Sequence, residues 1–206
     1  MQHVLEHIGV SVAAITGVLA ARGKQVDLFG VIVLALVTAL GGGTLRDLLV
    51  GDRPLFWIRD PAFVLNASAV AMLVFVVARF YEFPPLVLLV ADACALALFT
   101  VIGTKKALVF QVSPTIAVAM GVITGVVGGI MRDVLTGEIP LVFRREIYLY
   151  ATAALCGAVV FVLLRQWSPG EPVNMVAAAA TTLLLRMAAI RWKLGLPVYR
   201  HRGESS

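Results

Sequence analysis

A glycine pair followed after two residues by Arg-Asp occurs twice in this sequence of 206 residues, each time inside a long apolar segment. The stretch GGGTLRDLLVGDRP begins at Gly41, and the stretch VGGIMRDVLTGEIP begins 86 residues later at Val127. They are identical at seven of fourteen positions. A glycine in a helix costs about 1 kcal/mol relative to alanine, and a charge at the centre of a membrane helix costs at least about 2.5–3.5 kcal/mol. Residues this costly need a structural or a functional reason.

The glycines of the two motifs have two interpretations. Small residues let membrane helices pack closely. Alternatively, the helix breaks or kinks there and frees backbone groups to face an ion or water, which is tolerated only inside protein or beside a cavity. Threonines on the same helices either bond to their own backbone or, in a minority, line the path. The candidate pore and helix-break residues are Gly41, Gly42, Gly43, Gly128, Gly129, Thr38, Thr44 and Thr124.

Two Arg-Asp pairs follow the glycines, Arg46 with Asp47 and Arg132 with Asp133. Each arginine either extends to the membrane interface or has a function near the path, where its guanidinium holds an anionic lipid head group or gates the path. Each aspartate either caps a neighbouring helix or loop or takes part in the same path. All four residues are candidates for pore charge or gating.

Glu6 and Asp92 are a further acidic pair, separated by the same 86 positions as the two motifs. Asp92 lies about 13–14 Å into its apolar segment at about 1.5 Å per residue, close to the middle of a bilayer. There it can attract a cation, pair with an arginine or stay protonated, and the sequence leaves the three open. Both residues join the candidates for pore charge.

Other chemistries find no support in the sequence. It contains no His/Cys cluster with the spacing of metal ligands, no P-loop and no nucleophile with a plausible base. Cys94 and Cys156 both lie in apolar runs, which speaks against a disulfide framework. We expect no enzyme activity, no cofactor, and no metal site beyond transient binding of potassium or sodium.

The composition indicates that lipid is the solvent of these residues. Apolar residues make up 60% of the chain and charged residues 14%, compared with about 45–50% and 25% in soluble domains. This excludes disorder, nucleic-acid binding and an ordinary soluble enzyme. We expect an all-α membrane protein with seven spans, in the apolar runs 7–21, 28–45, 61–78, 83–104, 107–131, 147–164 and 172–190.

The self-match divides these spans into two inverted halves. Each half contains three crossings, and an odd number makes the second copy enter the membrane from the opposite face, as in many transporters. We expect a first three-helix repeat in residues 1–80, a second in residues 81–166, and an additional helix with a basic cytoplasmic tail in residues 167–206.

Lysine and arginine counts in the connections predict the orientation. One side has five and the opposite side nine, which places the C-terminus in the cytoplasm and the N-terminus outside. The pair Lys105 and Lys106 opposes this assignment, because both fall on the outer side.

The motifs GGGTLRDLL…GDRPLFWIRDP, DACALALFTVIGTKKAL and GVVGGIMRDVL resemble the prokaryotic trimeric intracellular cation (TRIC) channels, whose bacterial members are also labelled glycine transporters. The resemblance covers residues 3 to about 192. It implies a 3+3+1 arrangement, a homotrimer in the bacterial inner membrane, and a mainly potassium-selective pore in each protomer, with kinked second and fifth helices around it. The chain has Val127 where a third glycine would complete the second set. Animal relatives bind phosphoinositide at basic residues of the fifth helix, so the lipid-binding candidates here are Arg132, Lys105 and Lys106.

Three functions remain open at this point. The first is a passive monovalent-cation channel. The second is a carrier for a small zwitterion such as glycine, whose carboxylate would bind N–H groups at a helix break and whose ammonium would bind Asp92. The third is a membrane scaffold in which the glycines only pack helices.

Overall fold

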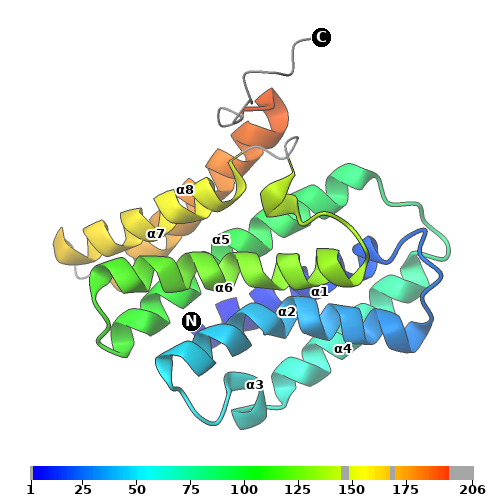
Figure 1. Cartoon of the computed structure of the whole chain (residues 1–206), viewed down its shortest axis with the longest axis horizontal. Helices are drawn as coiled ribbons and strands as arrows, with labels where there is room; N and C mark the ends of the chain where they lie inside the picture. The colour runs from blue at the N-terminus through cyan, green and yellow to red at the C-terminus, as the bar shows by residue number, and fades with distance from the viewer. Residues whose placement is uncertain (1, 145–148, 168–169, 195–206) are drawn as a thin grey trace, which may run out of the picture.

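The computed structural model describes residues 2–144, 149–167 and 170–194, and this part of the chain is all-helical (Figure 1). Six of its helices are long and apolar enough to cross a membrane, and a seventh, α4, is apolar but shorter. The predicted class, an all-α membrane protein with seven spans, is confirmed. The elements are α1 (Gln2–Ala20), α2 (Leu28–Val50), α3 (Phe56–Arg59), α4 (Ala62–Val77), α5 (Pro85–Val109), α6 (Pro114–Leu135), η1 (Leu141–Phe143), α7 (Tyr150–Trp167) and α8 (Glu171–Trp192).

The sequence analysis took charged residues as the ends of the spans, but in the structure several of them lie within the helices. The second run was expected to stop at Leu45, but α2 continues through Arg46 and Asp47 to Val50. It ends where Gly51 adopts a left-handed conformation with φ 75° and donates its N–H to backbone carbonyls of the last turn. The Arg-Asp pair therefore belongs to the helix.

The boundary between the fourth and fifth runs was also predicted wrongly. Lys105 and Lys106 lie inside α5, because both ammonium groups pair with carboxylates of neighbouring segments. The next helix begins at Pro114, a residue that suits the first turn, and the side chain of Ser113 caps it by accepting the N–H of Ile116 at 3.4 Å. The start of the sixth run and most of the predicted basic tail lie outside the described residues.

The long helices form one bundle in which α2 and α6 pack against each other and against α1 and α5. The α7–α8 pair lies along one side of this group and α4 along the other (Figure 1). Among the described residues, α7 and α8 pack mainly against α5 and α6, so the additional helix α8 extends one half of the inverted repeat.

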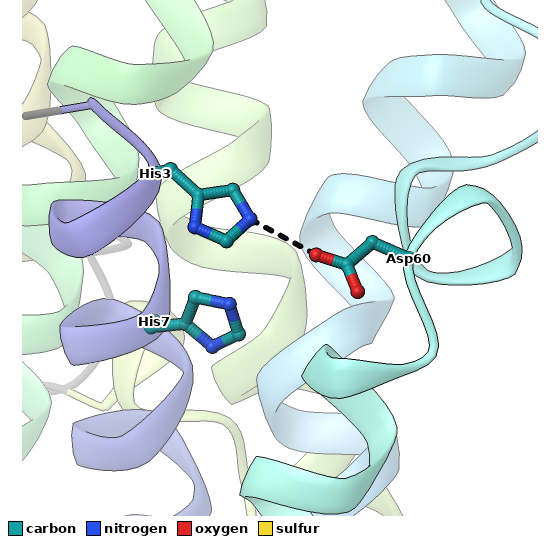
Figure 2. A group of neighbouring side chains, drawn as sticks. All are labelled: His3, His7 and Asp60. Carbon is teal, nitrogen blue, oxygen red and sulfur yellow. Dashed lines mark hydrogen bonds and ion pairs between the residues drawn. The ribbon is translucent and has the colours of Figure 1, made fainter.

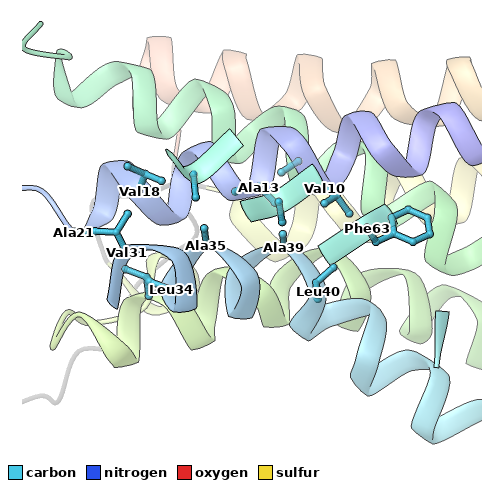
Figure 3. Close-up of a cluster of buried hydrophobic side chains, with 14 residues drawn as sticks. Val10, Ala13, Val18, Ala21, Val31, Leu34, Ala35, Ala39, Leu40 and Phe63 are labelled. Atoms are coloured by element: carbon cyan, nitrogen blue, oxygen red, sulfur yellow. The ribbon is translucent and has the colours of Figure 1, made fainter. Parts of the chain in front are cut away.

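Small residues bring α1, α2 and α4 together into an apolar core (Figure 3). Figure 3 shows Val10 and Ala13 of α1 opposite Ala39 and Leu40 of α2, with Phe63 of α4 beside them. A short side chain at each contact lets the helices approach closely, as is common in membrane bundles.

Ion pairs between distant parts of the chain lie at both ends of the bundle. At one end Lys24, in the connection between α1 and α2, pairs at 2.7 Å with Glu138, which follows α6. At the other end Lys105 pairs with Glu171 at 3.3 Å, and Lys106 with Asp52 at 2.7 Å. Each pair joins residues that the sequence assigned to the same side of the membrane, although Lys105 and Lys106 belong to α5 and Glu171 begins α8.

Candidate functional site

The α2–α6 crossing depends on one glycine from each motif. A Cβ atom at Gly42 would lie far inside van der Waals contact with the carbonyl oxygen of Thr124. A Cβ atom at Gly128 would meet the carbonyl oxygen of Thr38 in the same way. Gly42 and Gly128 are equivalent in the repeat, and so are Thr38 and Thr124, so the crossing is reciprocal. Close packing therefore explains both glycines.

Both helices run without interruption through their glycines, so the predicted break with open backbone is wrong. The physical reason is the close approach itself, which uses the missing side chains while the helical hydrogen bonds remain. Gly43 faces the ring of Phe56, and Gly129 faces the hydroxyl of Tyr150, where added Cβ atoms would lie 2.7 and 3.0 Å away. A kink within a continuous helix stays a prediction.

The threonines bond to their own helices. Thr38 Oγ1 donates to the carbonyl of Leu34 at 2.6 Å, and Thr124 Oγ1 donates to that of Met120 at 2.6 Å. Thr44 Oγ1 donates to the carbonyl of Leu40 at 2.8 Å. This is the usual role of membrane threonines, although Thr38 and Thr124 also line the cavity described below.

The two Arg-Asp pairs are buried and have the same internal geometry. Arg46 Nε donates to Asp47 Oδ1 at 2.8 Å, and Arg132 Nε donates to Asp133 Oδ1 at 2.8 Å. The arginine side chains are 5% and 0% exposed, so neither extends to the interface. The guanidinium of Arg46 also lies 5.7 Å from the centre of the Phe56 ring.

Each aspartate also holds the connection that follows its helix. Asp47 Oδ2 accepts the backbone N–H of Phe56 at 3.0 Å, at the start of α3. Asp133 Oδ2 accepts the N–H of Leu141 at 2.7 Å, at the start of η1. The capping role is therefore confirmed for both aspartates, and each motif links a buried arginine to a returning loop.

Asp92 is buried in α5 and pairs with Arg132, whose Nη1 lies 2.8 Å from its Oδ1. Of the three alternatives for Asp92, the structure contains the pair with an arginine. Asp92 Oδ2 and Arg132 Nη2 make no hydrogen bond within the described protein. Glu6 is half-buried in α1. Arg132 thus bridges Asp92 in α5 and Asp133 in α6.

The first motif has basic partners whose pairing with it the sequence did not indicate, although Lys106 was a lipid-binding candidate. Lys106 Nζ lies 2.8 Å from Asp47 and 2.7 Å from Asp52, and Arg59 lies 2.7 Å from Asp52. Burial raises the pKa of Asp52, but hydrogen bonds from Lys106 and Arg59 outweigh it and hold the pKa below its ordinary value. Three segments meet here, and no local spacing in the sequence could have indicated their meeting.

The second motif is covered by Tyr150 of α7 and Arg186 of α8, which were also missed as site residues. Both are buried, and the guanidinium carbon of Arg186 lies 4.7 Å from the centre of the Tyr150 ring. The available signal was the charge of Arg186 inside the last apolar run. Aromatic and cationic groups therefore enclose Asp92 and Arg132 from the side of the added helix.

A small cavity of about 10 Å³ lies at the crossing of α2 and α6, which is about the minimum for one water molecule. Gly41 and Thr44 do not reach it; they line an apolar groove of about 410 Å³ with Trp57 and Met131. Helices α1 and α5 complete the wall of the small cavity through Ala13, Thr16 and Phe99, among others. The candidate residues that line it are Thr38, Gly42, Gly43, Asp92, Thr124, Gly128 and Gly129.

The three lipid-binding candidates all have carboxylate partners. Arg132 is completely buried, Lys105 pairs with Glu171 and Lys106 pairs with two aspartates. A phosphate group would therefore have to displace a carboxylate at each position. Lipid binding by these residues stays a prediction.

Comparison with known proteins gives consistent matches over nearly the whole chain. A family model described as "Glycine transporter" matches residues 3–79 and 89–166. The inner membrane protein YadS of Escherichia coli is 46% identical over 198 residues, which cover 95% of this chain and 94% of YadS. A membrane protein of Vibrio cholerae is 42% identical over 200 residues, 96% of this chain and 82% of its own.

Solved structures match equally well. The crystal structure of a TRIC trimeric intracellular cation channel orthologue from Rhodobacter sphaeroides has 41% identity and a TM-score of 0.89, and the match covers 94% of this chain and 98% of that one. A prokaryotic TRIC channel has 28% identity and a TM-score of 0.86 over 95% of this chain and 98% of its own.

Proposed function

This chain belongs to the glycine transporter family, whose solved structural relatives include TRIC channels, and we propose that it is a passive cation channel. The path runs through each protomer along the crossing of α2 and α6. The observation that carries the proposal is the cavity at this crossing, which sits between equivalent glycines of two inverted halves. Inverted repeats that meet near the middle of the membrane are a common design for transport.

The electrostatics of the crossing favour cations. Asp92 places a carboxylate at the cavity, and the backbone carbonyls of Thr38 and Thr124 lie at the points of closest approach. Arg132 is balanced by Asp92 and Asp133, and Arg186 also interacts with Asp92, so these four groups carry no net charge when all are ionised. The oxygens at the cavity, and not the total charge, therefore support a cation. Rings of carbonyl and carboxylate oxygens are typical of cation pathways, and potassium is the main permeant ion that we propose.

In this proposal the path is closed or constricted in the present conformation. A cavity with room for one water molecule does not give continuous passage to a hydrated ion. Conduction therefore requires α2 and α6 to shift or bend at their glycines, and the kinks expected from the sequence belong to this step.

The assembly and orientation of the channel are further parts of the proposal. We propose a homotrimer in the bacterial inner membrane, because the similar R. sphaeroides protein is described as trimeric and YadS as an inner membrane protein. The N-terminus lies outside and the C-terminus in the cytoplasm, as the lysine and arginine counts indicate. Anionic lipid bound near Lys105, Lys106 or Arg132 would modulate opening by competing with their carboxylate partners.

Potassium flux from liposomes tests the proposal. The Gly42→Leu variant fills the cavity and should abolish most of the flux, whereas Val33→Leu on the exposed face of α2 should leave it near the wild-type value. Thr124→Val is a second variant for the case in which Gly42→Leu fails to fold. It keeps the side-chain volume and removes one hydroxyl from the cavity wall. Flux no higher than in protein-free vesicles, across several voltages and lipid compositions, would refute the channel.

A carrier for a small zwitterion is the second candidate, because the matching family model is described as a glycine transporter. Asp92 would then hold the ammonium group of the substrate after release from Arg132. Labelled glycine uptake that saturates with concentration and disappears in Asp92→Asn supports this candidate. Potassium flux without saturation, in the absence of glycine uptake, supports the channel.

A further inference from the structure

Two histidines and an aspartate from distant parts of the sequence meet at the start of α1 (Figure 2). His3 and His7 are four residues apart and lie on the same face of α1, and Asp60 lies in the connection between α3 and α4. Their nearest ligand atoms, one from each residue, all lie within 4.8 Å of one another. This cluster is separate from the cavity at the α2–α6 crossing.

Neighbouring groups fix the orientation of both imidazole rings. The His7 ring stacks on the Phe63 ring with the ring centres 4.2 Å apart. The His3 ring lies edge-on to the His7 ring, with the ring centres 4.6 Å apart. Asn66 Nδ2 lies 3.3 Å from His7 Nδ1, so one nitrogen of His7 is held by α4. Figure 2 shows both rings turned towards Asp60, and His3 Nε2 lies 2.9 Å from Asp60 Oδ2.

Two imidazoles and one carboxylate are a donor set that first-row transition metals prefer, and calcium and magnesium prefer oxygen donors alone. In a tetrahedral zinc site with bonds of about 2.0 Å, ligand atoms lie roughly 3.3 Å apart. The donors already lie near that spacing, with His3 Nε2 2.9 Å from Asp60 Oδ2 and all three ligand atoms within 4.8 Å of one another. We propose that His3, His7 and Asp60 form a binding site for a divalent transition-metal ion, with Zn²⁺ as the probe.

Exposure of the cluster supports this assignment. The side chain of His3 is 63% exposed and that of Asp60 is 36% exposed, so an ion can enter from water and keep water as its remaining ligand. Asp60 Oδ1 accepts the N–H of Ala62 at 3.0 Å, which orients the carboxylate and leaves Oδ2 for the ion. A bound ion would tie the start of α1 to the start of α4.

The sequence did not indicate the site, because only the His-x-x-x-His spacing is local. Two histidines at this spacing on a membrane helix are compatible with an interfacial position alone. The third donor is supplied by the fold, through the turn that α3 makes before α4.

Isothermal titration of the full chain with ZnCl₂ tests the proposal, in detergent and without a polyhistidine tag. The expected stoichiometry is one zinc per chain. The variants His3→Ala, His7→Gln and Asp60→Asn should each weaken binding by about tenfold or more. His201→Ala, which changes the one histidine outside the cluster, should bind zinc as the wild type does.

Cobalt(II) gives an independent readout, because its visible absorption reports coordination by nitrogen and oxygen ligands. The wild type should show a band that zinc displaces, and His3→Ala should lose it while its melting temperature without metal stays unchanged. His3 is exposed, so this variant separates metal binding from folding. No saturable zinc binding, or equal affinity in His3→Ala and wild type, would overturn the proposal.

Discussion

At the residue scale, the reciprocal contact of Gly42 and Gly128 decides how closely α2 and α6 approach. In each case the atom that a Cβ would meet is a backbone carbonyl oxygen, which cannot move without moving its helix. Gly41 differs, because the atom nearest to an added Cβ is the flexible end of Met131 at 2.6 Å.

The first prediction compares these glycines by thermal melting in detergent. Gly42→Ala and Gly128→Ala should each destabilise the protein by about 1–3 kcal/mol, since the extra atom forces the helices apart. Gly41→Ala should be neutral or slightly stabilising, because Met131 can move and alanine favours the helix. Equal losses in all three variants would contradict the close-packing role.

The Asp92–Arg132 pair is the second residue-scale feature with a measurable consequence. Asp92→Asn leaves a completely buried arginine with one carboxylate instead of two, and breaking a buried ion pair costs about 3–5 kcal/mol. The control is Glu82→Gln, which changes an exposed pair with Arg22 that is worth about 0–1 kcal/mol. Denaturation of both variants under the same conditions measures the difference; similar losses would show that the buried pair adds nothing.

At the element scale, Asp47 and Asp133 couple each glycine-containing helix to its following loop. The carboxylate that binds the arginine also binds a backbone N–H eight or nine residues later in the chain. A movement of α2 or α6 therefore transmits to α3 or η1. We expect the connections that lead into α3 and η1 to move with α2 and α6 when the channel opens.

The third prediction tests this coupling by hydrogen exchange. Asp133→Ala should accelerate exchange of the Leu141 amide, because its 2.7 Å hydrogen bond to a carboxylate is lost. A charge-assisted hydrogen bond of this kind contributes about 1.5–3 kcal/mol. Glu138→Gln, in the same loop but with a half-exposed side chain, should leave that amide protected.

The sequence predicted the elements better than their boundaries. Hydrophobic runs located every long helix, but charges were taken as helix ends. Arg46 and Lys106 lie inside helices because carboxylates neutralise them, the adjacent Asp47 for Arg46 and the distant Asp47 and Asp52 for Lys106. The internal match predicted which residues are equivalent, including Gly42 with Gly128. It did not predict that the helices would stay intact there, since that depends on the carbonyls opposite each glycine.

At the scale of the whole molecule, the two inverted halves share their motifs but differ in surroundings. The Arg46 cluster contains Lys106, whereas the Arg132 cluster contains Asp92. In the part of the chain that the structure describes, α7 and α8 cover the second of these clusters with Tyr150 and Arg186. These differences involve contacts between distant segments, which a comparison of local motifs does not detect.

The unequal charge of these clusters has a consequence for current. Because the motifs end oppositely directed helices, Arg46 and Arg132 lie towards opposite ends of the path. The Arg46 cluster, with Lys106 and Arg59 against Asp47 and Asp52, has one positive charge in excess, whereas Arg132 and Arg186 are balanced by Asp92 and Asp133. An ion meets different potentials on entering from each end, so we expect rectification in symmetric potassium solutions. Single-channel recording of Lys106→Met, which removes one positive charge from the Arg46 cluster, should make the current–voltage curve more nearly linear.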